Sequence, residues 1–319
     1  MVHDTAPDRC GICGTRGRFP GFRVPEMMFG TREIFDYAQC IQCGCVQLTE
    51  IPADLERHYP PDYYAFTPVR PRSSRVRHLR NLRNRAYVRG DGVMGRLLDR
   101  IAPSPPEGVL GVFRRLQVPE DARILDVGCG SGKLLHDLAG IGFRSLTGVD
   151  PYLEESYGKE GDPVRLLRGD VGAAPGRYDL VMLHHALEHI PDQHRGVRAL
   201  AERLAPEGRC VIRIPVVPSS AWEEHGTLWV QWDAPRHVYL HTAASISTLA
   251  SAHGLRVVDS YQDSTDLQFW GSDLYRRDIP LVEGRGTIPR RRRRRELRRA
   301  RELNEAGRGD QAVFILSRG

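Results

Sequence analysis

The sequence lacks any long apolar run. None of its 319 residues lies in a stretch that approaches the roughly eighteen consecutive apolar side chains of a membrane-spanning helix. The first residues also lack the basic-then-apolar order of a secretory signal peptide, because Asp4 and Asp8 precede Cys10. These absences predict a cytoplasmic protein without a transmembrane segment, and a hydrophobic content of 40% predicts a folded chain.

Lysine is almost absent, since Lys133 and Lys159 are the two lysines among 46 basic residues. We attribute this skew to a GC-rich genome, so arginine by itself indicates no need for guanidinium chemistry. Two segments are nevertheless strongly basic: residues 70–100 hold ten arginines against two aspartates, and residues 285–301 hold ten against one glutamate. Because the formal charge of the whole chain is only +6, the rest of the sequence is net negative.

Composition divides the chain into three regions. Paired cysteines and few helical patterns mark a small module at residues 1–60, followed by a tyrosine-rich exit. In residues 61–104, apolar side chains recur with helical spacing among arginines until a proline-rich break, which predicts an amphipathic basic connector. Residues 105–319 form the third region, with insertions expected at about 217–241 and 263–310.

The third region alternates short apolar runs with helical patterns. Helices are predicted at 133–139, 193–204 and 243–252. The runs that predict strands are 123–127, 145–149, 164–167, 178–183, 210–214, 255–258 and 311–316. Such an alternation predicts an α/β fold with a parallel sheet covered by helices on both faces.

A glycine-rich turn follows the first of these strands. Gly128, Gly130 and Gly132 stand at every second position, where missing side chains let a ligand approach the backbone at the carboxyl end of the strand. A dinucleotide-binding turn would need another glycine at position 133, which is lysine. The turn therefore disfavours a ligand with a pyrophosphate.

Acidic residues end three successive strand runs. Asp126 precedes the glycine turn and could attract a cationic amine or sulfonium. Asp150 could accept hydrogen bonds from ribose hydroxyls, and Asp170 could accept one from an adenine amino group. The alternative is that these acids only cap the helices that follow.

Two cysteine pairs predict a metal site. Cys10 and Cys13 form one pair, Cys40 and Cys43 the other, and 26 residues separate the pairs, a pattern typical of a tetrahedral zinc ion held by four thiolates. Cys45 is an alternative ligand whose spacing fits less well. With four protein ligands the zinc would be structural, and it would stabilise a zinc-ribbon-like module too small to build its own core. The alternative is ordinary buried cysteines.

From about 105 to 262 and from 311 to 318, the chain resembles class I S-adenosylmethionine-dependent methyltransferases. The resemblance rests on the glycine turn, Asp150, the sequence Gly-Asp-Val at 169–171 and the sequence Leu-Glu-His-Ile-Pro-Asp at 187–192. It implies a Rossmann-like sheet of seven strands, the last of them antiparallel. It also implies that Gly128 and Gly130 lie against the methionine part of the cofactor, Asp150 against the ribose, and Asp170 with Val171 against the adenine.

The first sixty residues resemble a zinc-binding leader found on many bacterial methyltransferases. This second resemblance rests on the Cys-x-x-Cys-Gly sequence at 40–44 and the tyrosine-rich run at 58–64, and the sequence Pro-Arg-His-Val-Tyr-Leu at 235–240 extends it over most of the chain. Such relatives are associated with sugars, glycolipids and secondary metabolites. The resemblance therefore implies a small-molecule acceptor of one of these classes.

Histidines supply candidate bases for an acceptor hydroxyl, whose proton must leave during methylation. His184 and His185 follow a strand, Glu188 and His189 come shortly after, and His237 lies in a later segment. We expect His237 to be the base and His185 to be the next candidate, with Glu188 orienting an imidazole. The alternative is that these residues cap a helix or pair with one another.

The segment 219–240 occupies a position where this fold usually builds substrate recognition. It holds Trp222, Trp229 and Trp232 together with Arg236, a set that would suit a sugar or aromatic acceptor. Packing of a structural flap is the alternative.

The fourth strand run ends in His-His-Ala-Leu, and the Asn-Pro-Pro-Tyr-like box that family resemblance links to amino acceptors is missing. An oxygen or carbon acceptor is therefore predicted.

Two rival functions stay open at this point. The arginine run 290–295 could bind phosphates of RNA, of a nucleotide sugar or of a lipid surface, so an RNA methyltransferase is the second enzymatic prediction. The alternative for this run is a solvated helix. A non-catalytic binding scaffold on the methyltransferase fold is the prediction of another class.

Overall fold

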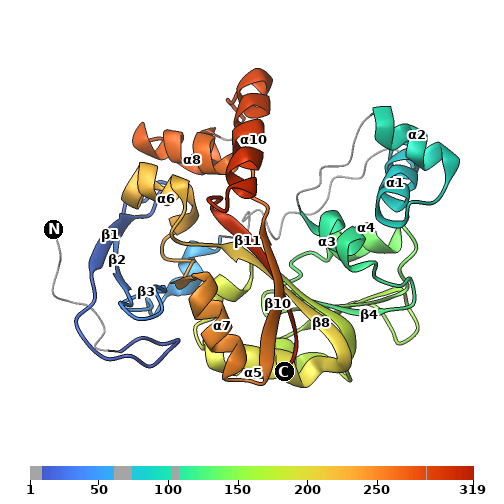
Figure 1. The fold of residues 1–319 in the computed structure, drawn as a ribbon, viewed down its shortest axis with the longest axis horizontal. Helices are drawn as coiled ribbons and strands as arrows, with labels where there is room; N and C mark the ends of the chain where they lie inside the picture. Colours follow the sequence, from blue (N-terminus) through green and yellow to red (C-terminus); the bar gives the residue numbers. More distant parts are fainter. Residues whose placement is uncertain (1–8, 61–73, 102–107, 285) are drawn as a thin grey trace. The chain divides into compact units, whose positions relative to one another are not determined.

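The computed structural model describes residues 9–60, 74–101, 108–284 and 286–319 (Figure 1). The tyrosine-rich run beyond residue 60, both ends of the predicted connector and the proline-rich break lie outside these ranges.

The strands are β1 Gly21–Pro25, β2 Ile34–Gln39, β3 Val46–Leu48, β4 Arg123–Val127, β5 Ser145–Asp150, β6 Val164–Arg168, β7 Tyr178–His184, β8 Leu204–Pro215, β9 Tyr239–Leu240, β10 Leu255–Gln262 and β11 Gln311–Arg318. The α-helices are α1 Ser74–Arg89, α2 Val93–Ile101, α3 Val109–Leu116, α4 Lys133–Ala139, α5 Gln193–Arg203, α6 Ser220–His225, α7 Ala243–Ser251, α8 Leu267–Arg276, α9 Leu281–Gly284 and α10 Arg290–Glu305. The 3-10 helices are η1 Leu55–His58, η2 Val171–Ala173, η3 Leu187–His189, η4 Gly226–Leu228 and η5 Val230–Trp232.

Seven strands form one sheet in the order β10-β11-β8-β7-β4-β5-β6. β4 pairs in parallel with β5 and with β7, and β5 pairs in parallel with β6, whereas β11 is antiparallel to β10. Every residue of β4 after its first is buried, as expected for a strand with helices over both faces. The predicted α/β fold with a seven-stranded, mostly parallel sheet and an antiparallel last strand is therefore confirmed.

The chain divides into two compact units. Unit 1 comprises residues 1–60, 184–201 and 211–319, and unit 2 comprises residues 61–183 and 202–210. The predicted boundaries at residues 60 and 104 are a different division of the chain and stay predictions.

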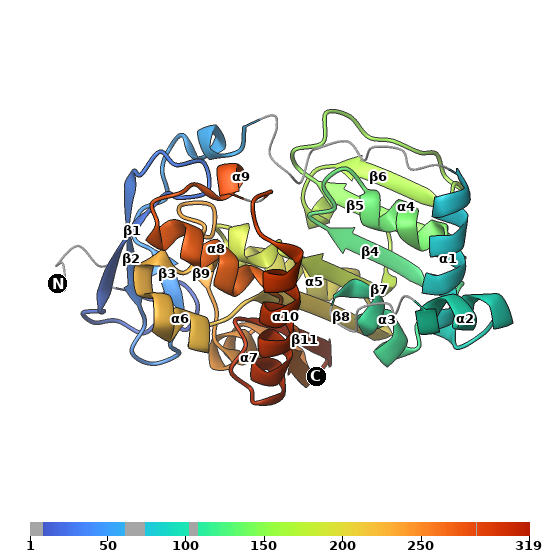
Figure 2. The same cartoon turned by 90° about the horizontal axis from the view of Figure 1, so that it is seen from above.

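Unit 2 holds the β4-β5-β6 part of the sheet, with α4 lying along it (Figure 2). The described part of the predicted basic connector forms two helices, α1 and α2, which pack against each other. Gly95 permits this close packing, because a Cβ there would lie 2.6 Å from the Cβ of Ala86. α2 leaves Val93, Met94 and Ile101 exposed by more than half of their surface.

Unit 1 contains a second sheet, in the order β1-β2-β3-β9. β1 to β3 come from the cysteine module, whereas β9 comes from the predicted insertion at 217–241 and pairs antiparallel with β3. Figure 1 shows the blue strands of the module beside α6 of that insertion. The module therefore shares a core with the insertion and α8, and the members of this shared core include Val24, Phe35, Tyr37, Trp229, Trp232, Leu240 and Trp270.

Among the helices in the described ranges, none has both the length and the apolar content needed to cross a membrane.

Candidate active site and metal centre

The predicted glycine turn joins β4 to α4 in unit 2. Gly128, Gly130 and Gly132 have φ values of 76°, 51° and 71°, a left-handed conformation that side-chain-bearing residues rarely adopt. A Cβ on Gly132 would also lie 2.7 Å from the side chain of Leu166. The backbone nitrogen of Gly128 donates to the carbonyl of Val149 at 2.8 Å, which fixes the turn against β5. The turn is therefore held against β5, and the exposed Gly128 presents bare backbone.

Asp126 is a buried acid at the carboxyl end of β4. Its exposed fraction is 3%, and burial together with the negative charge of Asp150 raises its pKa to about 7. Neither cause favours the carboxylate form, and within the described residues no cation offsets them. A buried carboxylate in this state gains stability when a positively charged group binds beside it. This property fits the amine or sulfonium of S-adenosylmethionine.

Asp150 ends β5 and supports the glycine turn. Its Oδ2 accepts a hydrogen bond from the Gly130 nitrogen at 2.8 Å, and its Oδ1 accepts one from the Tyr152 nitrogen at 2.9 Å. Because a carboxylate can accept about four hydrogen bonds, each oxygen still has room for a ribose hydroxyl.

Asp170 follows β6, the strand next to β5. Its side chain accepts a hydrogen bond from the Gly172 nitrogen at 2.8 Å and caps η2, as the capping alternative predicts. Val171 is 4% exposed. Since β4, β5 and β6 are neighbouring parallel strands, Asp126, Asp150 and Asp170 all lie at one edge of the sheet.

The four paired cysteines of unit 1 lie together. Sγ of Cys10 is 3.7 Å from Sγ of Cys43, Sγ of Cys13 is 3.5 Å from Sγ of Cys40, and all four sulfurs lie within 4.8 Å of one another. Thiolates around a tetrahedral zinc ion, with bonds of about 2.3 Å, stand about 3.8 Å apart. The spacing therefore fits zinc. Cys45 lies outside the group, where it is buried with its Sγ 4.0 Å from Nδ1 of His241.

The two cysteine pairs form matching turns. The nitrogen of Gly14 donates to the carbonyl of Cys10 at 3.0 Å, and the nitrogen of Gly44 donates to the carbonyl of Cys40 at the same distance. Backbone nitrogens also point at sulfur, since Ile12 lies 3.4 Å from the Sγ of Cys10. Such donors stabilise the thiolate form that binds metal.

His185 is held from both sides in unit 1. Its Nε2 lies 2.9 Å from Nη1 of Arg213, which can only donate, so Nε2 accepts and the proton is assigned to Nδ1. Nδ1 lies 3.3 Å from Oε1 of Glu188. Asp263 in turn binds Nε of Arg213 at 2.6 Å. The lone pair of His185 is therefore already used, which disfavours His185 as a base.

His237 has a different arrangement. Its Nδ1 lies 2.8 Å from the carbonyl of Gln231, which places the proton on Nδ1 and leaves a lone pair on Nε2. Nε2 lies 3.9 Å from Oε1 of Glu188 and 3.8 Å from Oδ2 of Asp233. Among the predicted histidines, His237 thus has the geometry of a base with acidic groups placed to stabilise its charged form.

Glu188 is the acid that these histidines surround. It is 1% exposed; burial favours its neutral form, but His185, His189 and His237 outweigh burial and lower its pKa to about 2. His189 packs edge-on against His237 with ring centroids 4.7 Å apart, and burial lowers its pKa. His184 is a poorer candidate, because burial and the nearby Arg213 lower its pKa to about 3.

Arg236 and the tryptophans of the 219–240 segment are structural. Arg236 is fully buried and binds Glu26 at 2.9 Å and Asp233 at 2.7 Å. Trp229 and Trp232 are buried in the core shared with the cysteine module. Their positions agree with the structural-flap alternative rather than with an aromatic face for substrate.

The arginine run forms part of α10, a helix whose arginines are largely paired on one side. The pairs are Arg292 with Glu296 at 2.7 Å and with Asp273 at 3.0 Å, Arg293 with Asp266 at 2.6 Å, and Arg299 with Glu224 at 2.8 Å. Arg290, Arg291, Arg294 and Arg295 are exposed. This arrangement agrees with the solvated-helix alternative.

Sequence reasoning missed the residues that fix the histidines. Arg213 carried a usable signal, since it is a charged residue inside the apolar run of β8. Glu26 and Gln231 carried none, because their roles depend on contacts with distant or backbone groups.

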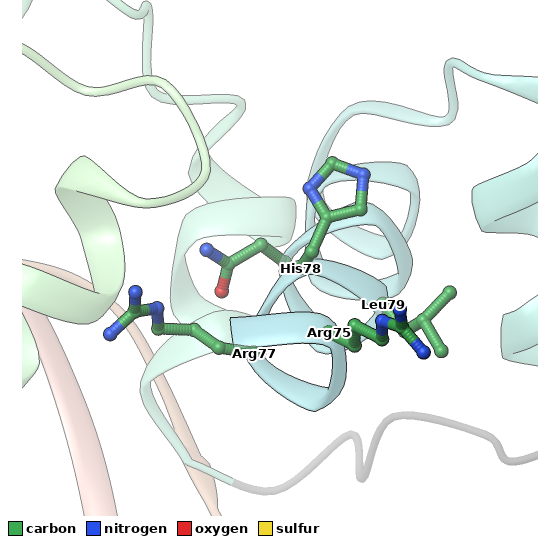
Figure 3. Close-up of a pocket in the computed structure, with 5 residues that line it drawn as sticks. Arg75, Arg77, His78 and Leu79 are labelled. Carbon is green, nitrogen blue, oxygen red and sulfur yellow. The ribbon is translucent and has the colours of Figure 1, made fainter. Parts of the chain in front are cut away.

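A hollow of about 600 Å³ lies along α1, lined by Arg75, Arg77, His78, Leu79 and Asn81 (Figure 3). It contains no predicted site residue, and its lining comes from a single helix.

Comparison with known proteins gives short matches to curated enzymes. The ubiquinone biosynthesis O-methyltransferase of Thiobacillus denitrificans is 37% identical over 97 residues, which cover 27% of this chain and 41% of the relative. The enzyme of the same name from Methylocella silvestris is 32% identical over 143 residues, which cover 42% of this chain and 49% of the relative. The chain thus spans less than half the length of these relatives.

Solved structures give wider but more distant likeness. The [4+2]-cyclase SpnF has a TM-score of 0.43 at 17% identity, covering 79% of this chain and 98% of that one.

The sequence profile of the family described as "Methyltransferase domain" matches residues 85–260. Since this match covers more than half of the 319 residues, the chain belongs to the methyltransferase domain family.

Proposed function

We propose that this protein transfers a methyl group from S-adenosylmethionine to an oxygen of a small molecule. The observation that carries the proposal is Asp126, a buried carboxylate with a raised pKa beside a bare glycine turn. The curated relatives are named as O-methyltransferases, which supports oxygen over carbon as the acceptor atom. Sugars, glycolipids and secondary metabolites are the acceptor classes that the sequence resemblance implies.

The cofactor residues belong to unit 2. When bound, S-adenosylmethionine supplies an electrophilic methyl group. Asp126 attracts its positive charge, Gly128 and Gly130 admit its methionine part, and Asp150 accepts hydrogen bonds from its ribose. Gly132 lets the turn pack against Leu166. Asp170 and Val171 hold the adenine, as family resemblance implies. The cysteine group holds one structural zinc ion.

The base belongs to unit 1. His237 accepts the proton of the acceptor hydroxyl at Nε2, because its Nδ1 is already committed to the Gln231 carbonyl. Glu188 stabilises the imidazolium that results, and His189 packs against the same ring. His185 lies 3.3 Å from Glu188 and is not the base, since Arg213 occupies its lone pair.

Calorimetric titration tests the role of Asp126. S-adenosylmethionine carries a sulfonium charge and S-adenosylhomocysteine does not, although both carry the amine. If Asp126 attracts the sulfonium, D126N weakens binding of S-adenosylmethionine by about 10- to 100-fold and binding of S-adenosylhomocysteine much less. If D126N weakens binding of both compounds equally, Asp126 interacts with the amine, which both compounds carry. D121N, at an exposed aspartate before β4, is the control and should bind both normally.

Two outcomes would overturn the proposal. If wild-type protein binds neither compound, the chain is a scaffold rather than an enzyme. If D126N binds both as tightly as D121N does, Asp126 is not part of the cofactor site. The base assignment is tested separately: H237Q should lower kcat by 10²- to 10⁴-fold while leaving cofactor affinity unchanged.

A further inference from the structure

Three side chains of unit 1 converge, and the acid at their centre has no aligned hydrogen bond within the described residues, although the surrounding histidines lower its pKa. Glu188, His189 and His237 each place one ligand-type atom within 4.8 Å of the others. Neither carboxylate oxygen of Glu188 has a hydrogen-bond partner in the described part of the chain, although the residue is 1% exposed. The His185 contact at 3.3 Å is close enough for a hydrogen bond but is not aligned for one. Such a buried carboxylate requires a positive partner.

Both histidines are oriented as metal ligands usually are. Nδ1 of His189 lies 2.8 Å from the carbonyl of Arg236, and Nδ1 of His237 lies 2.8 Å from the carbonyl of Gln231. Because a carbonyl can only accept, each ring carries its proton on Nδ1 and a lone pair on Nε2. In metal sites the same hydrogen bond fixes the tautomer and increases the basicity of the ligating nitrogen.

We propose that Glu188, His189 and His237 bind a divalent transition-metal cation. Two imidazoles and one carboxylate suit Zn²⁺, Fe²⁺ and similar ions, and three protein ligands leave coordination positions open. Ligands about 2.1 Å from a tetrahedral ion stand about 3.4 Å apart. The 3.9 Å between His237 Nε2 and Glu188 Oε1 needs to shorten by only about 0.5 Å, which side-chain rotation can supply.

This site differs from the cysteine site in ligand type and in having open positions. Binding of the cation does not depend on the proposed methyl transfer. A catalytic role of the cation does rest on the proposed function. In that role, a bound cation would coordinate the oxygen of the acceptor and lower the pKa of the acceptor hydroxyl. The Nε2 lone pair of His237 can hold either the cation or a proton. In the metal-loaded protein His237 is therefore a ligand rather than the base.

Metal stoichiometry of the full chain tests the proposal. Protein dialysed against Zn²⁺ and then against metal-free buffer should hold two zinc ions per chain, one at the cysteines and one at this site. E188Q and H237Q should hold one and should bind the second at least about tenfold more weakly. The control H78Q removes an exposed imidazole of α1 and should hold two.

Cobalt substitution shows whether each variant is folded. The intense thiolate-to-cobalt absorption reports the cysteine site alone, so it should persist in E188Q and H237Q while the weaker nitrogen-ligand bands are lost. One metal ion per wild-type chain, or two in both variants, would overturn the proposal. Normal binding of S-adenosylhomocysteine alongside such a result would leave the proposed function standing.

Discussion

Two aspartates, one in each unit, have opposite electrostatic states: Asp126 is 3% exposed, and the side chain of Asp233 is 13% exposed. Burial and Asp150 raise the pKa of Asp126 in unit 2 to about 7. Burial acts on Asp233 of unit 1 as well, but Arg236 and His237 outweigh it and lower the pKa to about 2. The difference lies in the neighbours and not in the residue type. Arg236 offsets Asp233 within the chain, whereas no cation among the described residues offsets Asp126. This difference is what the proposed cofactor role of Asp126 rests on.

The comparison separates structural acids from ligand-binding acids. In unit 1, arginines offset several acids internally: Arg236 binds Glu26 and Asp233, and Arg213 binds Asp263. Burial raises the pKa of Asp310 in the same unit to about 6, but this acid accepts a hydrogen bond from Nε1 of Trp229. Unit 2 leaves one carboxylate uncompensated beside a backbone turn. If this contrast is correct, removing internal partners from unit 1 should cost stability at every pH, whereas neutralising Asp126 should cost cofactor affinity and remove the pH dependence that Asp126 gives to stability.

The largest expected effect concerns the cysteine site of unit 1. C40S removes one of four thiolates and should abolish metal binding there, because serine is a poor zinc ligand. The free energy of unfolding should fall by more than about 5 kcal/mol, since zinc binding in small modules is worth about 10 to 16 kcal/mol. Urea unfolding and zinc content measure this. C210A, at a buried cysteine of β8, should lose about 1 kcal/mol and keep its zinc.

Breaking the Arg236 cluster is the second test. R236M leaves the buried Glu26 and the largely buried Asp233 without their cation, which should cost about 3 to 5 kcal/mol. Neutralising both acids in the same chain, as E26Q and D233N, should recover part of the loss. R144Q, at an exposed arginine, should leave the unfolding midpoint unchanged. A cost below about 1 kcal/mol for R236M would remove the contrast between the units.

The third prediction concerns pH and Asp126. Its folded pKa of about 7 exceeds its usual value of 3.8, so between these values the folded state binds more protons than the unfolded state. Stability without cofactor should therefore fall as pH rises from about 4 to about 7, by up to about 4 kcal/mol at 1.36 kcal/mol per pKa unit.

The D126N variant should lack this part of the pH dependence. Urea unfolding at several pH values measures it, and the slope is the readout because a buried asparagine has its own cost. D121N should follow the wild-type curve. Parallel curves for D126N and wild type would show that Asp126 is ionised at low cost and is not the uncompensated acid of unit 2.

Seven of the eleven strands in the described residues were predicted, β4 to β8, β10 and β11, because they contain local apolar runs. The strands of the cysteine module, β1 to β3, were not predicted. β10 was predicted too short, at 255–258, because it is an edge strand whose second half alternates between half-buried and exposed residues. β8 begins earlier than predicted, at Leu204, in a stretch that also carries the polar end of a helical pattern. β9 could not be predicted, since two residues become a strand only through pairing with β3.

The candidate sites divide in the same way. The glycine turn and the cysteine pairs have short spacings that the sequence shows directly. No local sequence pattern shows whether a buried acid is paired with a cation. Arg236 and its partner Glu26 are separated by 210 positions, so nothing near Glu26 in the sequence indicates that an arginine offsets its charge. The tryptophans of the 219–240 segment were ambiguous for the same reason, because their core partners are in the cysteine module.

The smallest expected effect tests whether burial, rather than pairing alone, distinguishes these acids. Arg293 binds Asp266 at 2.6 Å, but the arginine side chain is 54% exposed, so water already screens the pair. R293Q should change the free energy of unfolding by about 1 kcal/mol or less, far below the cost of R236M. R294Q, on the exposed side of α10, should have no measurable effect. If R293Q lowered the free energy of unfolding as much as R236M does, ion pairs would stabilise unit 1 whether or not they are buried. Burial would then not explain the difference between these acids. The lack of a cation beside the buried Asp126 would no longer be a reason to place a ligand there.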